Sequence, residues 1–137
     1  MIFENNELII NYPNNWIKQK NEIKNCLLII DYANKKSRIM LMNYPNEAVN
    51  INHLKSAIEL FPRDDNLKIV DSRIIQIKNK TVHELEAINV NSKPPLKTKS
   101  IGLINKNDVY IFNYMTFGLN NPEDNDLKKI IENLQFK

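Results

Sequence analysis

Short runs of apolar residues, each followed by a proline or a polar turn, dominate the first third of the chain. Their length and β-branched content are typical of strands, and the residues between them are typical of turns. The run at residues 26–33 is continuously apolar, which favours a strand buried on both faces. The strands predicted in this part of the chain are residues 7–12, 16–19, 26–33 and 38–44.

The apolar spacing changes to a helical one at residues 51–61, where apolar side chains recur at every third or fourth position. Asn50 or Asn52 can cap this helix. Pro62 ends it, because the residue before a proline avoids the helical conformation. The predicted apolar face consists of Ile51, Leu54, Ala57, Ile58 and Phe61.

Strand patterns return in the second half, with a turn predicted at Asn79–Lys80. Residues 91–97 are predicted to form a loop, because Pro94 and Pro95 cannot lie inside a paired strand. The predicted strands are residues 67–77, 81–90, 98–105 and 109–117. The last of these is apolar on both faces and is therefore expected at the centre of the sheet.

A final helix is predicted from Pro122, with Glu123 and Asp124 placed at the positive end of the helix dipole. Its apolar face would consist of Leu127, Ile130, Ile131 and Leu134. Short turns between neighbouring strands favour antiparallel pairing, and each helix has one apolar face that must cover the sheet. The predicted fold class is α+β, with a mostly antiparallel β-sheet flanked by two main helices.

Length and charge narrow the class of protein further. A chain of 137 residues fits one domain, and we expect residues 1–137 to form it. The net charge is only +3, and the lysines are interspersed with acidic residues. A nucleic-acid partner is therefore not expected, because such proteins concentrate basic residues on one face. Cys26 is the only cysteine, so no intrachain disulfide can form.

No stretch approaches the roughly 20 apolar residues that a membrane-spanning helix needs. Residues 1–12 also lack the pattern of a signal peptide. The chain as given is predicted to be cytoplasmic. The alternative is an exported or lipoprotein domain whose signal or anchor lay upstream and is absent from this chain.

Three segments together resemble the PsbP-like domains. Phe3 and the segment from Leu8 to Trp16, which contains Tyr-Pro-Asn-Asn-Trp, resemble the Phe-x-hydrophobic-x-Tyr-Pro-x-x-Trp opening of that family. Residues 80–87 resemble its hairpin strand, and the Ile-x-x-Leu-x-Phe sequence at residues 131–136 resembles the end of its terminal helix. The family's hairpin glycine is replaced by Asn79–Lys80, and asparagine tolerates the positive φ that such a turn needs.

The resemblance implies the α/β/α sandwich of the wider Mog1/PsbP/DcrB-like group. Roles in that group are diverse and include support of photosystem II, binding of a small GTPase and chaperoning of secreted effectors. None supplies a set of functional residues that can be transferred to this chain. The shared implication is a non-enzymatic accessory or adaptor domain that binds another protein. The alternative is a small-molecule or ion-binding module with a pocket between sheet and helix.

The two histidines do not form a convincing metal site. His83 alternates with Glu84 and Glu86 along one strand, so its side chain points away from both carboxylates. His53 is expected to be exposed on the first helix. No metal or cofactor is therefore predicted, because a zinc site needs three or four converging ligands.

Other reactive residues have ordinary structural explanations. Cys26 is expected to be buried and inert. Asp64, Asp65 and Asn66 could bind a cation, but a solvated turn is the favoured interpretation. Glu84 and Glu86 could act as an acid–base pair only if one were buried beside the other; pairing across the strands with a basic residue, Arg73 or Lys78, is favoured. No catalytic residue is predicted.

The remaining candidates are a set of aromatic side chains and a basic loop. Tyr110, Phe112 and Tyr114 could stack on nucleic-acid bases, but a core covered by a helix is the favoured interpretation. The loop is stiffened by two prolines and is expected to expose an apolar tip, and stiff loops lose little entropy when they bind a partner. The residues predicted to contact a protein partner are Lys93, Pro94, Pro95, Leu96, Lys97 and Lys99.

Overall fold

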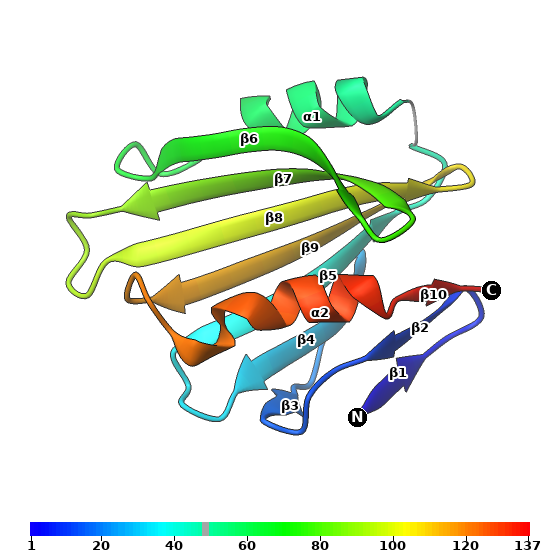
Figure 1. The fold of residues 1–137 in the computed structure, drawn as a ribbon, viewed down its shortest axis with the longest axis horizontal. Helices are drawn as coiled ribbons and strands as arrows, with labels where there is room; N and C mark the ends of the chain where they lie inside the picture. Colours follow the sequence, from blue (N-terminus) through cyan, green and yellow to red (C-terminus); the bar gives the residue numbers. More distant parts are fainter. Residues whose placement is uncertain (48–49) are drawn as a thin grey trace.

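The computed structural model describes residues 1–47 and 50–137. Within these residues, seven strands form one antiparallel sheet with β9 in the middle (Figure 1). From one edge to the other the strands are β3 (Trp16–Lys18), β4 (Cys26–Tyr32), β5 (Ser37–Tyr44), β9 (Asp108–Phe117), β8 (Leu96–Asn105), β7 (Lys80–Asn89) and β6 (Lys68–Ile77). The predicted antiparallel sheet and its central strand at residues 109–117 are confirmed.

A second sheet of three strands brings the two ends of the chain together. Its central strand, β2 (Leu8–Asn11), pairs antiparallel with β1 (Ile2–Glu4) and with β10 (Gln135–Phe136). Neither β1 nor β10 is predicted from the sequence, because strands of two or three residues show no period. The assignment of residues 131–136 to the end of the terminal helix is wrong, since the helix ends at Glu132 and Phe136 lies in β10.

Two helices lie on opposite faces of the large sheet. α1 (Ile51–Leu60) begins where the Asn50 side chain accepts a hydrogen bond from the His53 N–H, at 2.9 Å, and it ends before Pro62 as predicted. α2 (Asp126–Glu132) follows a short 3-10 helix, η1 (Pro122–Asn125). No helix in the described part of the chain is long and apolar enough to cross a membrane.

Each face of the large sheet has its own core. On one face, α2 and the small sheet cover the side chains of Trp16, Tyr110, Phe112 and Tyr114. The prediction that these three β9 aromatics belong to the core is confirmed. The core on the other face, under α1, consists of Leu54, Ile58, Leu85, Ala87, Val109 and Ile111. The α/β/α arrangement predicted from the resemblance is thus present.

A glycine sets the distance between α1 and the sheet. A Cβ atom at Gly102, in β8, would lie 3.0 Å from Ile58 Cδ1 and 3.1 Å from Leu54 Cδ2. The missing side chain lets both helix residues rest directly on the β8 backbone.

Two local predictions are wrong. β8 begins at Leu96, so the loop before it is shorter than the predicted residues 91–97. Ile77 pairs with Lys80, which makes Lys78–Asn79 the two-residue turn, and the positive φ of 54° falls on Lys78. The turn residue therefore lies one position earlier than the sequence pattern predicts.

Candidate binding surface

Helix α1 covers only part of its face of the sheet, because its main contacts are with β6, β7 and β8. On that face β9 presents every second side chain, from Val109 to Phe117. Their exposed fraction rises along the strand, from 5% at Val109 and 7% at Ile111 to 36% at Met115 and 45% at Phe117. The C-terminal end of β9 therefore leaves an apolar part of the sheet face uncovered.

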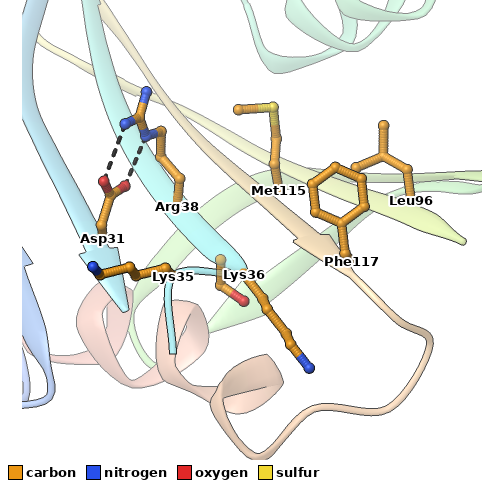
Figure 2. A pocket seen from close by; sticks show the side chains of 8 residues that line it. Asp31, Lys35, Lys36, Arg38, Leu96, Met115 and Phe117 are labelled. Atoms are coloured by element: carbon orange, nitrogen blue, oxygen red, sulfur yellow. Dashed lines mark hydrogen bonds and ion pairs between the residues drawn. The ribbon is translucent and has the colours of Figure 1, made fainter. Parts of the chain in front are cut away.

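A hollow of about 360 Å³ lies at this uncovered end (Figure 2). Met115 and Phe117 of β9 and Leu96 of β8 form one side of it, and Leu96 lies directly opposite Phe117 in the strand register. These three side chains come from neighbouring central strands, so they share a rigid base. Together they form a partly exposed apolar surface large enough to receive a side chain from another molecule.

Basic residues border the same hollow. Lys35 and Lys36, in the turn between β4 and β5, are exposed and form no ion pair with any described residue. Arg38 also lines it, but its guanidinium donates two hydrogen bonds to the Asp31 carboxylate, at 2.7 and 3.0 Å. The free positive charge at this site therefore comes mainly from the two lysines.

The predicted partner-binding loop is attached to the same end of β9. The Pro95 carbonyl accepts a hydrogen bond from the Gly118 N–H, at 2.7 Å. The Ser92 hydroxyl donates to the Pro94 carbonyl at 2.8 Å, which further fixes the loop. Lys93 and Pro94 are exposed. These contacts hold the loop at the C-terminal end of β9.

The second half of the predicted loop is part of β8 and does not form one exposed surface. Lys97 is only 7% exposed, and its ammonium donates to the Asp124 carboxylate at 2.6 Å and to the Leu119 carbonyl at 3.0 Å. Lys99 is half-buried, and Leu96 is half-buried on the opposite face. The expectation of an exposed Leu96 beside exposed lysines is wrong, because side chains alternate between faces once the strand begins.

A buried polar cluster lies between η1 and the sheet, and sequence analysis missed it. Glu123 is 1% exposed, and its Oε2 accepts hydrogen bonds from the Ser37 hydroxyl at 2.6 Å and the Asn34 amide at 2.8 Å. Its Oε1 has no partner among the described residues. Thr116 is the position from which this cluster could have been predicted, because a polar residue there continues the buried alternation of the β9 aromatics. In the structure its hydroxyl shares a 2.6 Å hydrogen bond with Ser37.

His83 belongs to a chain of hydrogen bonds under α1. The Ser72 hydroxyl lies 2.9 Å from His83 Nε2 and donates to Glu59 at 2.6 Å. Burial lowers the pKa of His83, which is fully enclosed at 0% exposure. In a catalytic triad the histidine lies between the serine and the acid. Here the serine lies between the acid and the histidine, so the three residues do not form a triad.

The other candidates occupy ordinary structural positions. Arg73 pairs with Glu84 across the strands at 3.1 Å, as predicted. Cys26 is partly exposed, so the prediction that it is buried is wrong, although partial burial raises the pKa of its thiol. The Asp64 carboxylate accepts the Asn66 N–H at 2.8 Å within a turn. His53 is exposed.

No group of three His, Cys, Asp or Glu side chains in residues 1–47 and 50–137 is arranged to hold a metal ion.

Two further hollows lie side by side between α1 and the sheet. One, of about 130 Å³, is mainly apolar, and the other, of about 290 Å³, has polar walls near the end of the helix. Four residues line both hollows, so the two adjoin: Tyr44, Ile58, Phe61 and Ile111. They form one groove, which we call the α1 groove.

No family model matches the sequence, and no curated protein matches it significantly. Solved structures do match the fold. The solution structure of cyanobacterial PsbP (CyanoP) from Synechocystis sp. PCC 6803 matches 100% of this chain and 92% of its own, with a TM-score of 0.63 and 9% identity. The chain therefore has the PsbP-like fold, as the sequence resemblance predicts.

Two other structures support the same conclusion. A crystal structure from Bacteroides thetaiotaomicron VPI-5482 matches 95% of this chain at a TM-score of 0.70 and 8% identity, and this chain spans only 45% of its length. The crystal structure of LpqN, described as involved in cell envelope biogenesis of Mycobacterium tuberculosis, matches 95% of this chain and 83% of its own, at a TM-score of 0.54 and 10% identity. At such low identity the likeness concerns the fold alone.

Proposed function

We propose that this chain is a non-enzymatic accessory or adaptor domain that binds another protein at the hollow formed by Leu96, Met115 and Phe117. The occupant is an acidic segment of the partner that inserts a large apolar side chain. The observation that carries this proposal is an apolar surface with unpaired lysines at its border. Aromatic and apolar anchors supply most of the binding energy at protein interfaces, and charge complementarity directs the partner.

Only part of the predicted partner-binding loop is included in this proposal. Leu96 lines the hollow, and Lys93, Pro94 and Pro95 directly precede it in a loop that is bonded to Gly118 at the end of β9. Lys97 and Lys99 are left out, because they point to the other face of the sheet. Lys35 and Lys36 take their place as the basic residues that meet the partner.

The non-enzymatic part of the proposal rests on the buried histidine. His83 is fully enclosed, so no substrate can reach its imidazole without movement of α1. The Ser72 hydroxyl donates a hydrogen bond to Glu59, so its contact with His83 is not the serine-to-histidine donation of a hydrolase triad. The cytoplasmic location and its exported alternative both stay predictions.

The test compares two triple variants with the same change of charge. Lys35→Glu, Lys36→Glu and Lys93→Glu together reverse the charge of two lysines that line the hollow and of one in the loop before Leu96. Lys24→Glu, Lys68→Glu and Lys128→Glu reverse three exposed lysines elsewhere. We expect the first variant to lose at least tenfold in affinity for a protein captured from native lysate, and the control to retain it.

A photo-crosslinking amino acid at position 115 identifies what enters the hollow, and the same group at the exposed position 17 is the control. The proposal requires an acidic segment with an apolar side chain, cross-linked from position 115 and not from position 17. Equal cross-linking from both positions, a basic segment, or equal binding by both triple variants would remove the hollow as the interface.

A second candidate function is a small-molecule-binding module, and the α1 groove is the observation that favours it. This groove lies between sheet and helix, where the sequence-based alternative places a pocket. It is separate from the proposed protein site and can be tested independently.

A further inference from the structure

We propose that the α1 groove binds a small carboxylate with an unbranched apolar chain, such as a medium-chain fatty acid. This inference deepens the second candidate function and does not depend on protein binding at the other hollow. It rests on three features of the groove: an uncompensated cation at one end, an apolar wall at the other, and four lining residues that the two ends share.

The cation is Arg63, which lines the 290 Å³ hollow just after the end of α1. Its guanidinium donates hydrogen bonds to three carbonyl oxygens: those of Ile58 at 2.5 Å, Phe61 at 3.0 Å and Glu59 at 3.1 Å. Guanidinium has five N–H donors, so two remain. The carbonyls at the end of a helix carry only a partial negative charge, and they position the guanidinium without neutralising it.

No carboxylate of a described residue lies within ion-pair distance of Arg63. The other polar groups near it also suit an anion. Asn113 lines the same hollow, and its side-chain oxygen accepts a hydrogen bond from the Ser100 hydroxyl at 2.8 Å. The Asn113 amide nitrogen is therefore left as a donor. A carboxylate accepts hydrogen bonds from both Arg63 and Asn113 without needing a donor of its own.

The other end of the groove suits an apolar chain. The 130 Å³ hollow is lined by Leu54, Ala57 and Val109 in addition to the shared residues. Val109 is only 5% exposed, so a chain lying there would contact the floor of the sheet. Glu47 and His53 also line this end, and the negative charge of Glu47 disfavours a carboxylate there. The charges at the two ends thus fix one direction for the ligand, with its head at Arg63.

Isothermal titration of the whole chain with decanoate tests the inference, with decanol and acetate as comparison ligands. We expect one decanoate per chain and at least tenfold weaker binding of decanol, because decanol lacks the charge that strengthens the hydrogen bonds from Arg63. Acetate should not bind measurably, because it lacks the apolar chain. Absence of decanoate binding, or equal affinity for decanol, would overturn the proposal.

Two variants locate the site. Ala57→Phe fills the apolar hollow from an exposed helix position and should abolish decanoate binding, whereas Ser56→Phe, one residue earlier and outside the lining, should leave it unchanged. Asn113→Asp places a negative charge beside the head group and should weaken decanoate at least tenfold more than decanol. Equal effects of both Phe substitutions would contradict this location.

A control separates this inference from the proposed protein site. The triple variant at Lys35, Lys36 and Lys93 should bind decanoate with unchanged affinity, and Ala57→Phe should retain a captured protein. Failure of decanoate to bind the wild-type chain would leave the protein site standing, because the two sites share no lining residue.

Discussion

Lys97 and Asp124 form the least exposed ion pair in the described part of the chain, with side chains 9% and 20% exposed. Burial alone would raise the pKa of Asp124. Hydrogen bonds from the Asn121 N–H, the Lys97 ammonium and the Tyr114 hydroxyl outweigh it and hold the pKa below the ordinary value. The pair joins β8 to η1, so one lysine fixes the entry of the chain into its last helix.

Lys97→Met should lower the free energy of unfolding at pH 7 by about 2–4 kcal/mol, because it leaves a carboxylate in a poorly hydrated position without its cation. The carboxylate contributes stability above the unfolded-state Asp pKa of about 3.9, and this contribution is lost as the pH falls through the lower folded-state pKa. The difference in the free energy of unfolding between the wild type and Lys97→Met should shrink as the pH approaches this range, because protonated Asp124 no longer needs the cation. Urea unfolding at several pH values measures both effects.

The control is Arg73→Gln, which removes the cation of an exposed pair with Glu84. Because the Arg73 side chain is 58% exposed, this substitution should cost only about 0–1 kcal/mol. Similar losses in the two variants would show that burial does not distinguish the two pairs.

Lys93 and Lys97 flank the same prolines, so nothing in the local sequence distinguishes the exposed lysine from the buried one. The difference arises because β8 begins two residues earlier than its pattern predicts, and pairing with β9 then turns Lys97 inward. Such a register is decided by the neighbouring strand and not by the local sequence. Asn50, in contrast, is predicted as one of two possible caps because its hydrogen bond is local.

Among the elements, α1 depends most directly on one position outside itself. Leu54 and Ile58 approach the β8 backbone only because Gly102 has no side chain. The helix is also connected to β6 by the hydrogen bond between Ser72 and Glu59. The packing of α1 therefore depends on two strands that follow it in the sequence.

Gly102→Val should lower the free energy of unfolding by about 1–3 kcal/mol, because the added methyl groups force Leu54 and Ile58 outward. Gly102→Ala should cost less, since only the flexible ends of two side chains must move by a few tenths of an ångström. Hydrogen exchange should locate the loss in α1. Uniform loss of protection over the whole sheet would contradict a local effect.

The order of strands and helices follows from periodicity, and this is why the fold is predicted well at the scale of elements. The candidate protein site is predicted poorly at the same scale. Residues 109–117 are apolar on both faces, so the sequence indicates a strand covered on both faces. α1 is displaced toward β6 and β7, and this displacement leaves Met115 and Phe117 open.

At the scale of the molecule, the last strand pairs with the second one, so the two ends of the chain lie in one small sheet. β10 pairs with β2, and the Phe136 ring lies 5.2 Å from that of Tyr110, between centroids. The Tyr110 hydroxyl in turn donates to Glu7 at 2.5 Å. These contacts connect the end of the chain both to the small sheet and to the central strand.

Deletion of residues 135–137 should lower the free energy of unfolding by about 1–3 kcal/mol, because it uncovers apolar surface on Tyr110 and Leu8. Lys137→Ala is the control; it removes only the exposed ion pair with Glu4 and should cost about 0–1 kcal/mol. Guanidinium unfolding monitored by tryptophan fluorescence measures both. A deletion as mild as the control would show that β10 adds nothing to the core.

The position of the small sheet has a practical consequence for orientation. β1 and β10 flank β2 on the α2 side of the large sheet, so both chain ends emerge there (Figure 1). A tether at either end, whether to a sensor chip, a fluorophore or a neighbouring domain, attaches behind the sheet. The face with the apolar hollow and the α1 groove then points away from the point of attachment, and both sites stay accessible to solution.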